Sequence, residues 1–249
     1  MERFLPKRPD GYSFCIITDG KDPGLTLREI ASIHALGMPS YEVVLGGRWR
    51  GPTDGMKCSF ADLSQLADTG RIGEMRNVLG QQATQGHIIF ADDDLVFNGD
   101  FYEGLLRYGE DYDALSCRIL NPDGTRYWDW KKHVNGKDYL LPYHLSSPWV
   151  SLTGTFSILK ADLFDSIKWN PLLGFYAGED VDFSERLRAG GARIRFNPYS
   201  SILHDDDRYY QFGRSVRRGF GLLRSIAKPL NSAFDAYCAI SRGKVSRPP

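Results

Sequence analysis

The 249-residue sequence has no apolar run approaching the roughly 20 residues that a membrane-spanning helix needs. Its opening stretch, Met-Glu-Arg-Phe-Leu-Pro-Lys-Arg-Pro-Asp, lacks an apolar core, so we expect no secretory signal there. It also lacks an excess of charge, because 31 basic residues balance 31 acidic ones. This balance removes any general reason to expect nucleic-acid binding, and we predict no nucleic-acid partner.

Cysteine is scarce, and its spacing excludes two further classes of protein. The four cysteines lie far apart and form no Cys-x-x-Cys pair, at Cys15, Cys58, Cys117 and Cys238. A zinc site or a disulfide framework is therefore not expected. A reducing, cytoplasmic environment fits this usage best.

Short apolar runs alternate with helical periodicity in the first part of the chain. We expect strands at 14–18, 41–45 and 87–91, and helices at 25–36 and 72–83. Strand, helix and strand at this spacing are typical of a parallel α/β sheet. The chain is long enough for one large α/β domain.

The second part of the chain has a less regular pattern. A helix is expected at 101–108, and residues 121–148 indicate an irregular excursion or a short antiparallel pair of strands. A strand is expected over 150–159. The remaining expected elements are helices at 162–167 and 178–189 and strands at 193–196 and 202–204.

Three adjacent carboxylates, Asp92, Asp93 and Asp94, follow the expected strand at 87–91. They repel one another unless a cation or a donor-rich ligand neutralises them, and such oxygen ligands suit Mg²⁺ or Mn²⁺. Ligands of open α/β sheets bind outside the carboxyl ends of the strands, which favours a site here. A solvated acidic turn is the alternative.

Two later features could complete such a site. Glu179 and Asp180 open the expected helix at 178–189, and either could act as a general base. They could equally be acids that stabilise the helix dipole. His204 ends the last expected strand, where a neutral imidazole can bind a divalent metal, although a single histidine is more often structural.

Basic residues precede the acidic strand. Arg71 and Arg76, with Asn77 beside them, could contact phosphate near a helix start. The alternative is a polar helix face on which these residues pair with Glu74.

Taken in order, these stretches resemble the family 2 glycosyltransferases and their GT-A relatives over about residues 12–207. The matching segments are the Arg-Asn helix at 73–80 leading into the strand at 88–94, then 153–164, then 178–187 with Gly190-Gly191, and finally His204. The resemblance implies an α/β fold of the GT-A (Rossmann-like) type. This fold has a mostly parallel sheet flanked by helices, with a short antiparallel portion.

The resemblance also implies an activity, a metal-dependent glycosyltransferase of the hexosyltransferase type. The enzyme would move a sugar from a nucleotide-diphosphate sugar to a hydroxyl acceptor, with inversion, using Mn²⁺ or Mg²⁺. The implied roles are Asp180 as base assisted by Glu179; Asp94 and His204 as metal ligands; Asp92, Asp93, Thr18, Asp19, Arg71 and Arg76 as nucleotide-sugar contacts. The acceptor, a saccharide or a lipid-linked saccharide, would lie beside Trp128, Trp130, Gly154 and Thr155, with Tyr127 and Trp149 also bordering it. The alternative is that these aromatic side chains fill the core.

Two departures from the family pattern concern the nucleotide pocket. The first strand ends in Thr18-Asp19-Gly20-Lys21 where the family has a Pro-Thr-Tyr-Asn type of loop, and Gly46-Gly47 stand where aspartates usually hold the nucleotide. The choice of nucleotide is therefore left open. A retaining GT-A transferase, a nucleotidyltransferase that makes sugar nucleotides and a non-catalytic sugar-nucleotide-binding module are the alternatives.

Residues 208–249 form a second expected unit, a basic helical extension of the domain at 1–207. Nine Lys or Arg residues stand against Asp235 alone, and apolar side chains from Tyr209 to Leu223 follow helical spacing. Such a helix can pack on the catalytic domain or lie on an anionic membrane surface. The second option predicts peripheral contact with the inner face of a membrane.

Overall fold

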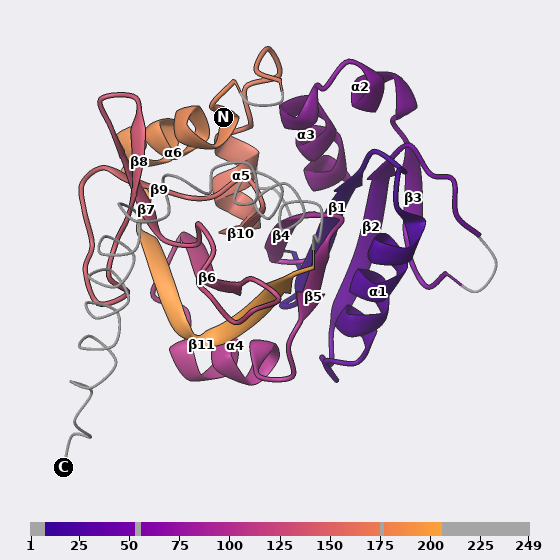
Figure 1. Cartoon of the computed structure of the whole chain (residues 1–249), viewed down its shortest axis with the longest axis horizontal. Helices are drawn as coiled ribbons and strands as arrows, with labels where there is room; N and C mark the ends of the chain where they lie inside the picture. Colours follow the sequence, from indigo (N-terminus) through magenta and orange to yellow (C-terminus); the bar gives the residue numbers. More distant parts are fainter. Residues whose placement is uncertain (1–7, 53–55, 175–176, 206–249) are drawn as a thin grey trace, which may run out of the picture. The chain divides into compact units, whose positions relative to one another are not determined.

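The computed structural model of the chain describes residues 8–52, 56–174 and 177–205 (Figure 1). The chain divides into two compact units, Met1–Asp205 and Asp206–Pro249. The expected basic helix at 208–249 lies outside the described residues, so its packing stays a prediction. Within the described ranges, no helix is both long and apolar enough to cross a membrane.

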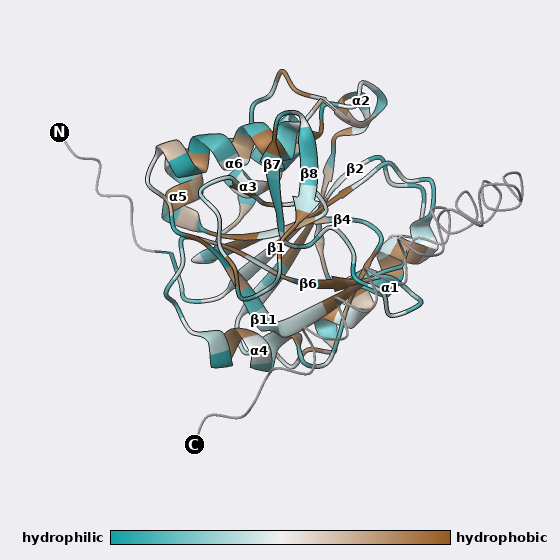
Figure 2. Cartoon of the chain, turned by 60° about the vertical axis from the view of Figure 1, so that its left-hand side comes forward, coloured by the Kyte–Doolittle hydropathy of each residue, from teal (hydrophilic) through white to brown (hydrophobic). Residues whose placement is uncertain are grey.

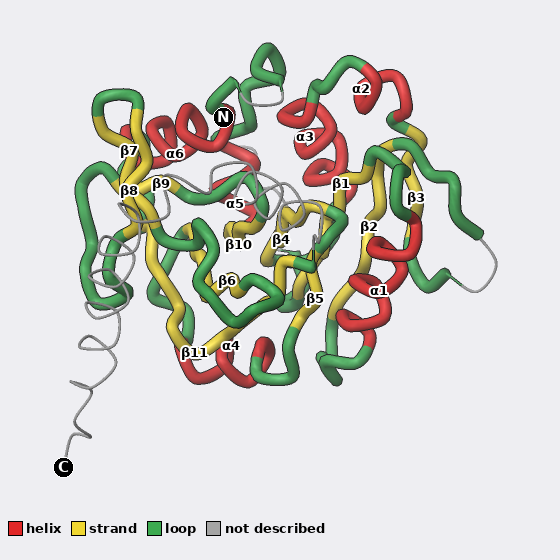
Figure 3. Tube along the Cα trace, viewed as in Figure 1, coloured by secondary structure: helices red, strands yellow, loops and turns green. Residues whose placement is uncertain are grey.

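A sheet of eight strands forms the centre of the first unit, in the order β3-β2-β1-β4-β10-β6-β11-β5 (Figure 3). Neighbours from β3 to β4 pair in parallel, as do β6 and β11, whereas β10 and β5 are antiparallel to their neighbours. The expected mostly parallel α/β sheet is confirmed. The strands are β1 Tyr12–Thr18, β2 Tyr41–Gly47, β3 Ser59–Asp62, β4 His87–Asp92, β5 Leu95–Phe97, β6 Ala114–Leu120, β10 Phe156–Lys160 and β11 Ile194–His204.

Helices cover both faces of this sheet, which is why its central strands are apolar on both sides. Side chains of α1 and α4 pack with Phe14 and Ile89 on one face, and side chains of α3, α5 and α6 pack with Cys15 and Phe90 on the other. Figure 2 shows the apolar strands at the centre and more polar helices around them. The helices are α1 Pro23–His34, α2 Ser64–Asp68, α3 Ile72–Gln82, α4 Phe101–Tyr108, α5 Ala161–Ser166 and α6 Glu179–Ala189.

A second, small sheet is built from the excursion after β6. Strands β7 (Lys131–Val134) and β8 (Lys137–Leu140) form an antiparallel hairpin, and β9 (Val150–Ser151) pairs with the other side of β7. The hairpin turn uses Asn135 and Gly136, both with positive φ. The short antiparallel pair expected within 121–148 is confirmed.

Two expected strand boundaries were wrong. The expected strand at 150–159 is broken: residues 152–155 carry the chain from β9 in the small sheet to β10 in the main one. The separate strands expected at 193–196 and 202–204 are one strand, β11, whose register shifts between Asn197 and Ser201. The Asn197 amide donates to the Gly104 carbonyl oxygen at 3.2 Å, which stabilises this irregularity and keeps the strand continuous.

Strands β3, β5 and β6 were not expected from the sequence. Strand β6 lies deep in the sheet, yet it carries Ser116, Cys117 and Arg118 in place of an apolar run. Ser116 is fully buried, and its hydroxyl is satisfied there because it donates to the Asp129 carbonyl oxygen at 2.7 Å. A buried polar residue with a partner far along the chain leaves no local signal.

The topology brings several strand ends to one edge of the sheet. Strands β1, β2 and β4 are parallel, and two antiparallel pairings through β10 make β6 and β11 run the same way. Thr18, Gly47, Asp92 and His204 therefore all lie at the carboxyl edge. Antiparallel β10 begins at this edge, directly after Thr155. Open α/β sheets bind their ligands at such an edge.

Candidate active site

The acidic triplet forms the turn between β4 and β5 at the carboxyl edge. The Thr18 hydroxyl at the end of β1 donates to Asp93 Oδ2. Asp94 is buried, and its Oδ2 lies 3.5 Å from His204 Nε2 at the end of β11. The Asp205 amide also donates to the Asp94 carbonyl oxygen at 2.7 Å. The turn is thus attached to the first and last long strands of the sheet.

Burial makes charge on this turn costly. It raises the pKa of Asp92 to about 6, against the opposing effect of Arg76, and raises the pKa of Asp93 to about 6, against the hydrogen bond from Thr18. Carboxylates with raised pKa values gain the most from a cation that favours their charged form. A cation bound beside the turn would therefore favour the charged forms of Asp92 and Asp93.

His204 is held in place by an aromatic contact. Its ring stacks on Tyr127 with centroids 4.4 Å apart and planes 15° from parallel, and the residue is 6% exposed. Among the described residues, no three His, Cys, Asp or Glu side chains already form a metal-binding group. An Asp94–His204 pair with open positions still fits Mn²⁺ or Mg²⁺, which usually take few protein ligands beside substrate phosphates.

Arg76 lies under the site as a buried cation, with 1% of its side chain exposed. Its Nη2 donates to Asp92 Oδ1 at 3.1 Å and to the Gly154 carbonyl oxygen at 2.7 Å, and its Nη1 lies 3.6 Å from Glu179 Oε1. One guanidinium therefore links β4, the 152–155 crossing and α6. Its burial favours a role in neutralising these carboxylates over direct contact with a donor phosphate.

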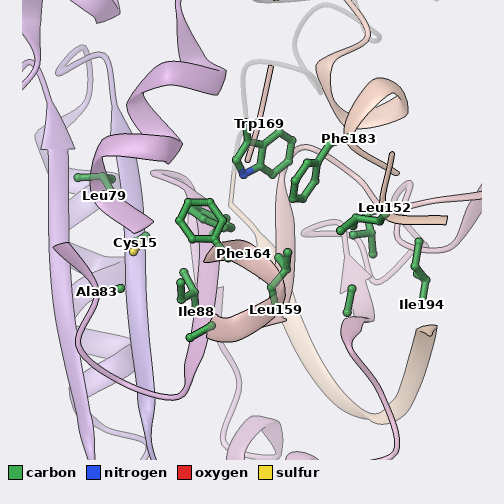
Figure 4. Close-up of a cluster of buried hydrophobic side chains, with 14 of the residues drawn as sticks. Cys15, Leu79, Ala83, Ile88, Leu152, Leu159, Phe164, Trp169, Phe183 and Ile194 are labelled. Carbon is green, nitrogen blue, oxygen red and sulfur yellow. The ribbon is translucent and has the colours of Figure 1, made fainter. Parts of the chain in front are cut away.

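The core positions this arginine. Its guanidinium lies over the Trp169 ring at 4.6 Å, and that ring stacks on Phe183 of α6 at 4.0 Å (Figure 4). Asn77, the residue after Arg76, fixes the same tryptophan: its amide donates to the Trp169 carbonyl oxygen at 2.8 Å and accepts from the Trp169 amide at 2.9 Å. The Arg-Asn pair thus joins the hydrophobic core to the acidic turn.

Glu179 and Asp180 begin α6 beside Gly154. A Cβ atom at Gly154 would lie 3.0 Å from Glu179 Oε1 and 3.8 Å from Asp180 Cβ, so this close approach favours glycine. Burial raises the pKa of Glu179, and Arg76 opposes that shift. Asp180 Oδ2 accepts from Lys131 Nζ at 2.8 Å. The two acids therefore have different partners, although they are neighbours on one helix turn.

Two further residues expected to contact the nucleotide pair with neighbours close in the sequence. Asp19 follows Thr18 and is exposed, with its carboxylate paired to Lys21. Arg71 is 43% exposed and pairs with Glu74 at 2.6 Å, which is the alternative considered for it from the sequence. Arg71, the residue before α3, is thus partly exposed, whereas Arg76 within α3 is buried.

The fold exposes some of the residues expected on the acceptor side and buries others. Trp128 is 46% exposed and Trp149 is 57% exposed, so both rings present a surface to solvent. Trp130 is 2% exposed, and its indole Nε1 donates to the Leu145 carbonyl oxygen at 2.7 Å. Trp130 is therefore a core side chain in this structure. Thr155 is buried and accepts a hydrogen bond from the Asp92 amide through its carbonyl oxygen at 3.0 Å.

Two charged residues near the site were missed from the sequence. Glu29 of α1 is fully buried, and burial followed by the charge of Asp93 raises its pKa well above the usual value. Its signal was its place on the apolar face of α1, between Leu25 and Ile33 at four-residue spacing. Lys131 gave no comparable signal, because adjacent lysines normally indicate a solvated surface.

Comparisons with known proteins match this chain by fold. No family profile and no curated protein sequence matches it. Among solved structures, GalNAc-T7 with UDP, GalNAc and Mn²⁺ is similar with a TM-score of 0.62 and 14% identity, over 78% of this chain and 43% of that one. Residues 1–349 of S. aureus TarS in complex with UDP are similar with a TM-score of 0.55 and 17% identity, over 81% of this chain and 62% of that one.

These neighbours are glycosyltransferases with a GT-A-like fold. This chain spans less than two thirds of the length of either one. At such low identity the similarity establishes the fold alone. The sheet, its flanking helices and the small antiparallel sheet make this chain an α/β protein with a GT-A-like fold.

Proposed function

We propose that this chain is a metal-dependent glycosyltransferase that transfers a sugar from a nucleoside-diphosphate sugar to an acceptor hydroxyl. One observation carries the proposal: three segments distant in the sequence meet at the carboxyl edge, where Arg76 pairs with Asp92 and Glu179 and where His204 lies 3.5 Å from Asp94. UDP in a solved TarS structure, and UDP with Mn²⁺ in a solved GalNAc-T7 structure, support the same ligand classes for this fold.

In the proposed reaction the acceptor oxygen attacks the anomeric carbon of the donor sugar. The acceptor O–H proton passes to the carboxylate of Asp180 as the new C–O bond forms. The bond from the anomeric carbon to the phosphate oxygen breaks, and its electron pair leaves with the nucleoside diphosphate. Displacement from the opposite face inverts the anomeric centre.

Asp94 and His204 would hold the divalent cation, which supplies a Lewis acid for the diphosphate leaving group. Asp92 and Asp93 would contact the ribose and diphosphate, with Thr18 and the exposed Asp19, Arg71 and Lys21 nearby. We propose that Arg76 neutralises the negative charges of Asp92 and Glu179, so that these carboxylates can lie partly buried.

The exposed aromatic rings support a saccharide or a lipid-linked saccharide as acceptor. Trp128 and Trp149 present large apolar surfaces next to the small sheet, and aromatic faces are suited to stacking on sugar rings. A lipid-linked acceptor would agree with peripheral membrane contact through the basic segment at 208–249. That segment lies outside the described residues, so this part of the proposal depends on its sequence alone.

Thermal shift with a panel of nucleoside diphosphates tests the central idea. Each nucleotide is added with Mn²⁺, with Mg²⁺ and with a chelator. We expect at least one nucleotide to raise the Tm only when the metal is present, because a ligand that binds the folded state stabilises it. If no nucleotide raises the Tm with either metal, the proposed function fails.

Two substitutions separate metal binding from base catalysis. Asp94→Ala should abolish the metal-dependent Tm shift, because it removes a proposed ligand. Asp180→Asn should keep that shift and lose transfer, since the amide cannot take the acceptor proton. Glu103→Ala, an exposed acid on α4, serves as the matched control and should retain both. Transfer by Asp180→Asn would contradict the role of the base.

A further inference from the structure

The β7–β8 hairpin places a buried lysine against the proposed base. Lys131 Nζ donates to Asp180 Oδ2 at 2.8 Å and to Asp138 Oδ2 at 2.7 Å. The Lys131 side chain is 7% exposed and that of Asp180 is 15% exposed. A lysine is seldom this buried unless its charge is paired, so the two carboxylates account for the burial of Lys131.

Both oxygens of Asp180 are engaged by these contacts and by its own helix. Oδ2 accepts from Lys131, and Oδ1 accepts from the Val181 amide at 2.8 Å. The Asp180 carbonyl oxygen also accepts from the Ser184 hydroxyl at 2.6 Å. The carboxylate plane is therefore fixed from two sides, and only its remaining lone pairs can face an acceptor hydroxyl.

The lysine is shared with a second acid that has a further partner. Asp138 Oδ1 lies 2.8 Å from His133 Nδ1, so a chain of contacts runs from His133 through Asp138 and Lys131 to Asp180. Burial lowers the pKa of the Lys131 ammonium, but Asp180 and Asp138 outweigh that effect and raise it above the usual value. The lysine therefore remains a cation at neutral pH.

Within the part of the chain that the structure describes, the other cation close to α6 has different partners. Arg76 is committed to Asp92 and Glu179 and to the Gly154 carbonyl oxygen. The titratable and charged groups that surround the base from its own helix, the hairpin, α3 and β4 are Glu179, Lys131, Asp138, His133, Arg76 and Asp92.

We propose that Lys131 is a positioning residue for the base, because its ammonium holds Oδ2 of Asp180. Asp138 accepts from the same ammonium and therefore competes with Asp180 for its positive charge. This inference rests on the proposed role of Asp180 as the base. It assigns the small sheet a part in the reaction, because β7 carries the lysine and β8 carries the acid that shares it. Removing the lysine should free Oδ2 of Asp180 from this contact, and removing Asp138 should leave the ammonium to Asp180 alone.

The test compares pH–rate profiles of transfer and nucleotide affinity in the full chain. For Lys131→Met we expect kcat to fall about tenfold or more, because a misplaced base reacts poorly. We expect the acid limb of the profile to move up by about one pH unit or more, since a nearby cation is lost. The Kd for the nucleotide with Mn²⁺ should stay within about twofold, because Lys131 touches none of the proposed donor contacts.

Three companion variants make the result decisive. Asp138→Asn should move the acid limb to lower pH, and Lys131→Arg should keep it near the wild-type position. Lys132→Met, which removes the neighbouring lysine of β7, should leave the profile unchanged. If Lys131→Met fails to fold, the shift in Asp138→Asn decides, and an unmoved limb there overturns the proposal.

A purely structural role predicts something different. In that case Lys131→Met would lower the Tm and the amount of active enzyme without moving the acid limb, and this result would overturn the proposal. Asp180→Asn distinguishes the two ideas. If that variant still transfers sugar, the base assignment fails; if it is inactive while Lys131→Met has the wild-type profile, only the role of the lysine fails.

Discussion

Replacement of Arg76 by methionine tests how the site tolerates buried charge. Methionine preserves much of the apolar stem but removes the guanidinium that contacts Asp92, Glu179 and the Gly154 carbonyl oxygen. Removing one partner of a buried ion pair costs about 3–5 kcal/mol, because the other charge is left uncompensated. For a domain of this size the Tm should fall by roughly 6–20 °C.

The direction in which pH changes the stability loss of Arg76→Met gives a sharper check. Asp92 has a pKa of about 6, and Glu179 has a raised pKa, even with Arg76 present. Without the arginine both carboxyls will bind protons at still higher pH. Lowering the pH from 8 to 5.5 therefore neutralises them in the folded variant, and the loss of stability should shrink.

Urea unfolding at both pH values measures this loss. Arg71→Met is the matched control, because Arg71 caps the start of the same helix but is 43% exposed, and its pair with Glu74 should contribute at most about 1 kcal/mol. Adding Glu179→Gln to Arg76→Met should restore part of the stability, since one uncompensated charge is removed. A loss below about 1 kcal/mol at pH 8, or a loss independent of pH, would refute the reasoning.

Three further predictions concern the acidic turn, the second strand and the tryptophans. Without added metal, the protonated carboxyls of Asp92 and Asp93 should contribute stability that is fully present below pH about 3.8 and is lost as the pH rises to about 6. In chemical unfolding, the chain with both residues replaced by Asn should lack this pH dependence of the free energy of unfolding. Gly47→Asp should destabilise the chain measurably in urea, because a Cβ there would lie 1.9 Å from the Thr18 carbonyl oxygen; unchanged stability would refute this account. Trp130→Ala should cost about 3–5 kcal/mol in the same assay, whereas exposed Trp149→Ala should change stability by less than about 0.5 kcal/mol and raise the acceptor KM.

The sequence predicted the elements with strong local patterns. The helix at 101–108 was found at its observed bounds, and the strands before Thr18 and Asp92 were found because they are continuous apolar runs. Strand β6 was missed because buried Ser116 and half-exposed Arg118 interrupt its apolar run, and the partner of Ser116 lies 13 residues away. The break between β9 and β10 was missed because it depends on contacts of Gly154 with Arg76 and Glu179, which no local pattern reveals.

The candidate site was likewise predictable only in part. The acidic triplet and His204 could be placed because strand ends at one edge of a sheet are predictable from topology. The buried state of Arg76 could not, since its partners Asp92, Gly154 and Glu179 lie far along the chain. Lys131 pairs with a residue 49 positions away, and only the folded chain brings the two together.

The glycine pair at the end of β2 restricts how the proposed nucleotide site could be redesigned. At Gly47, φ is 136° and the space for a side chain is occupied by the backbone of β1, so an aspartate cannot be grafted there by substitution alone. The adjacent strand β3 ends in Asp62, which is in register with Gly47 and is open to solvent. A library intended to change nucleotide selectivity should therefore vary β3 and the residues after it, and leave Gly47 as it is.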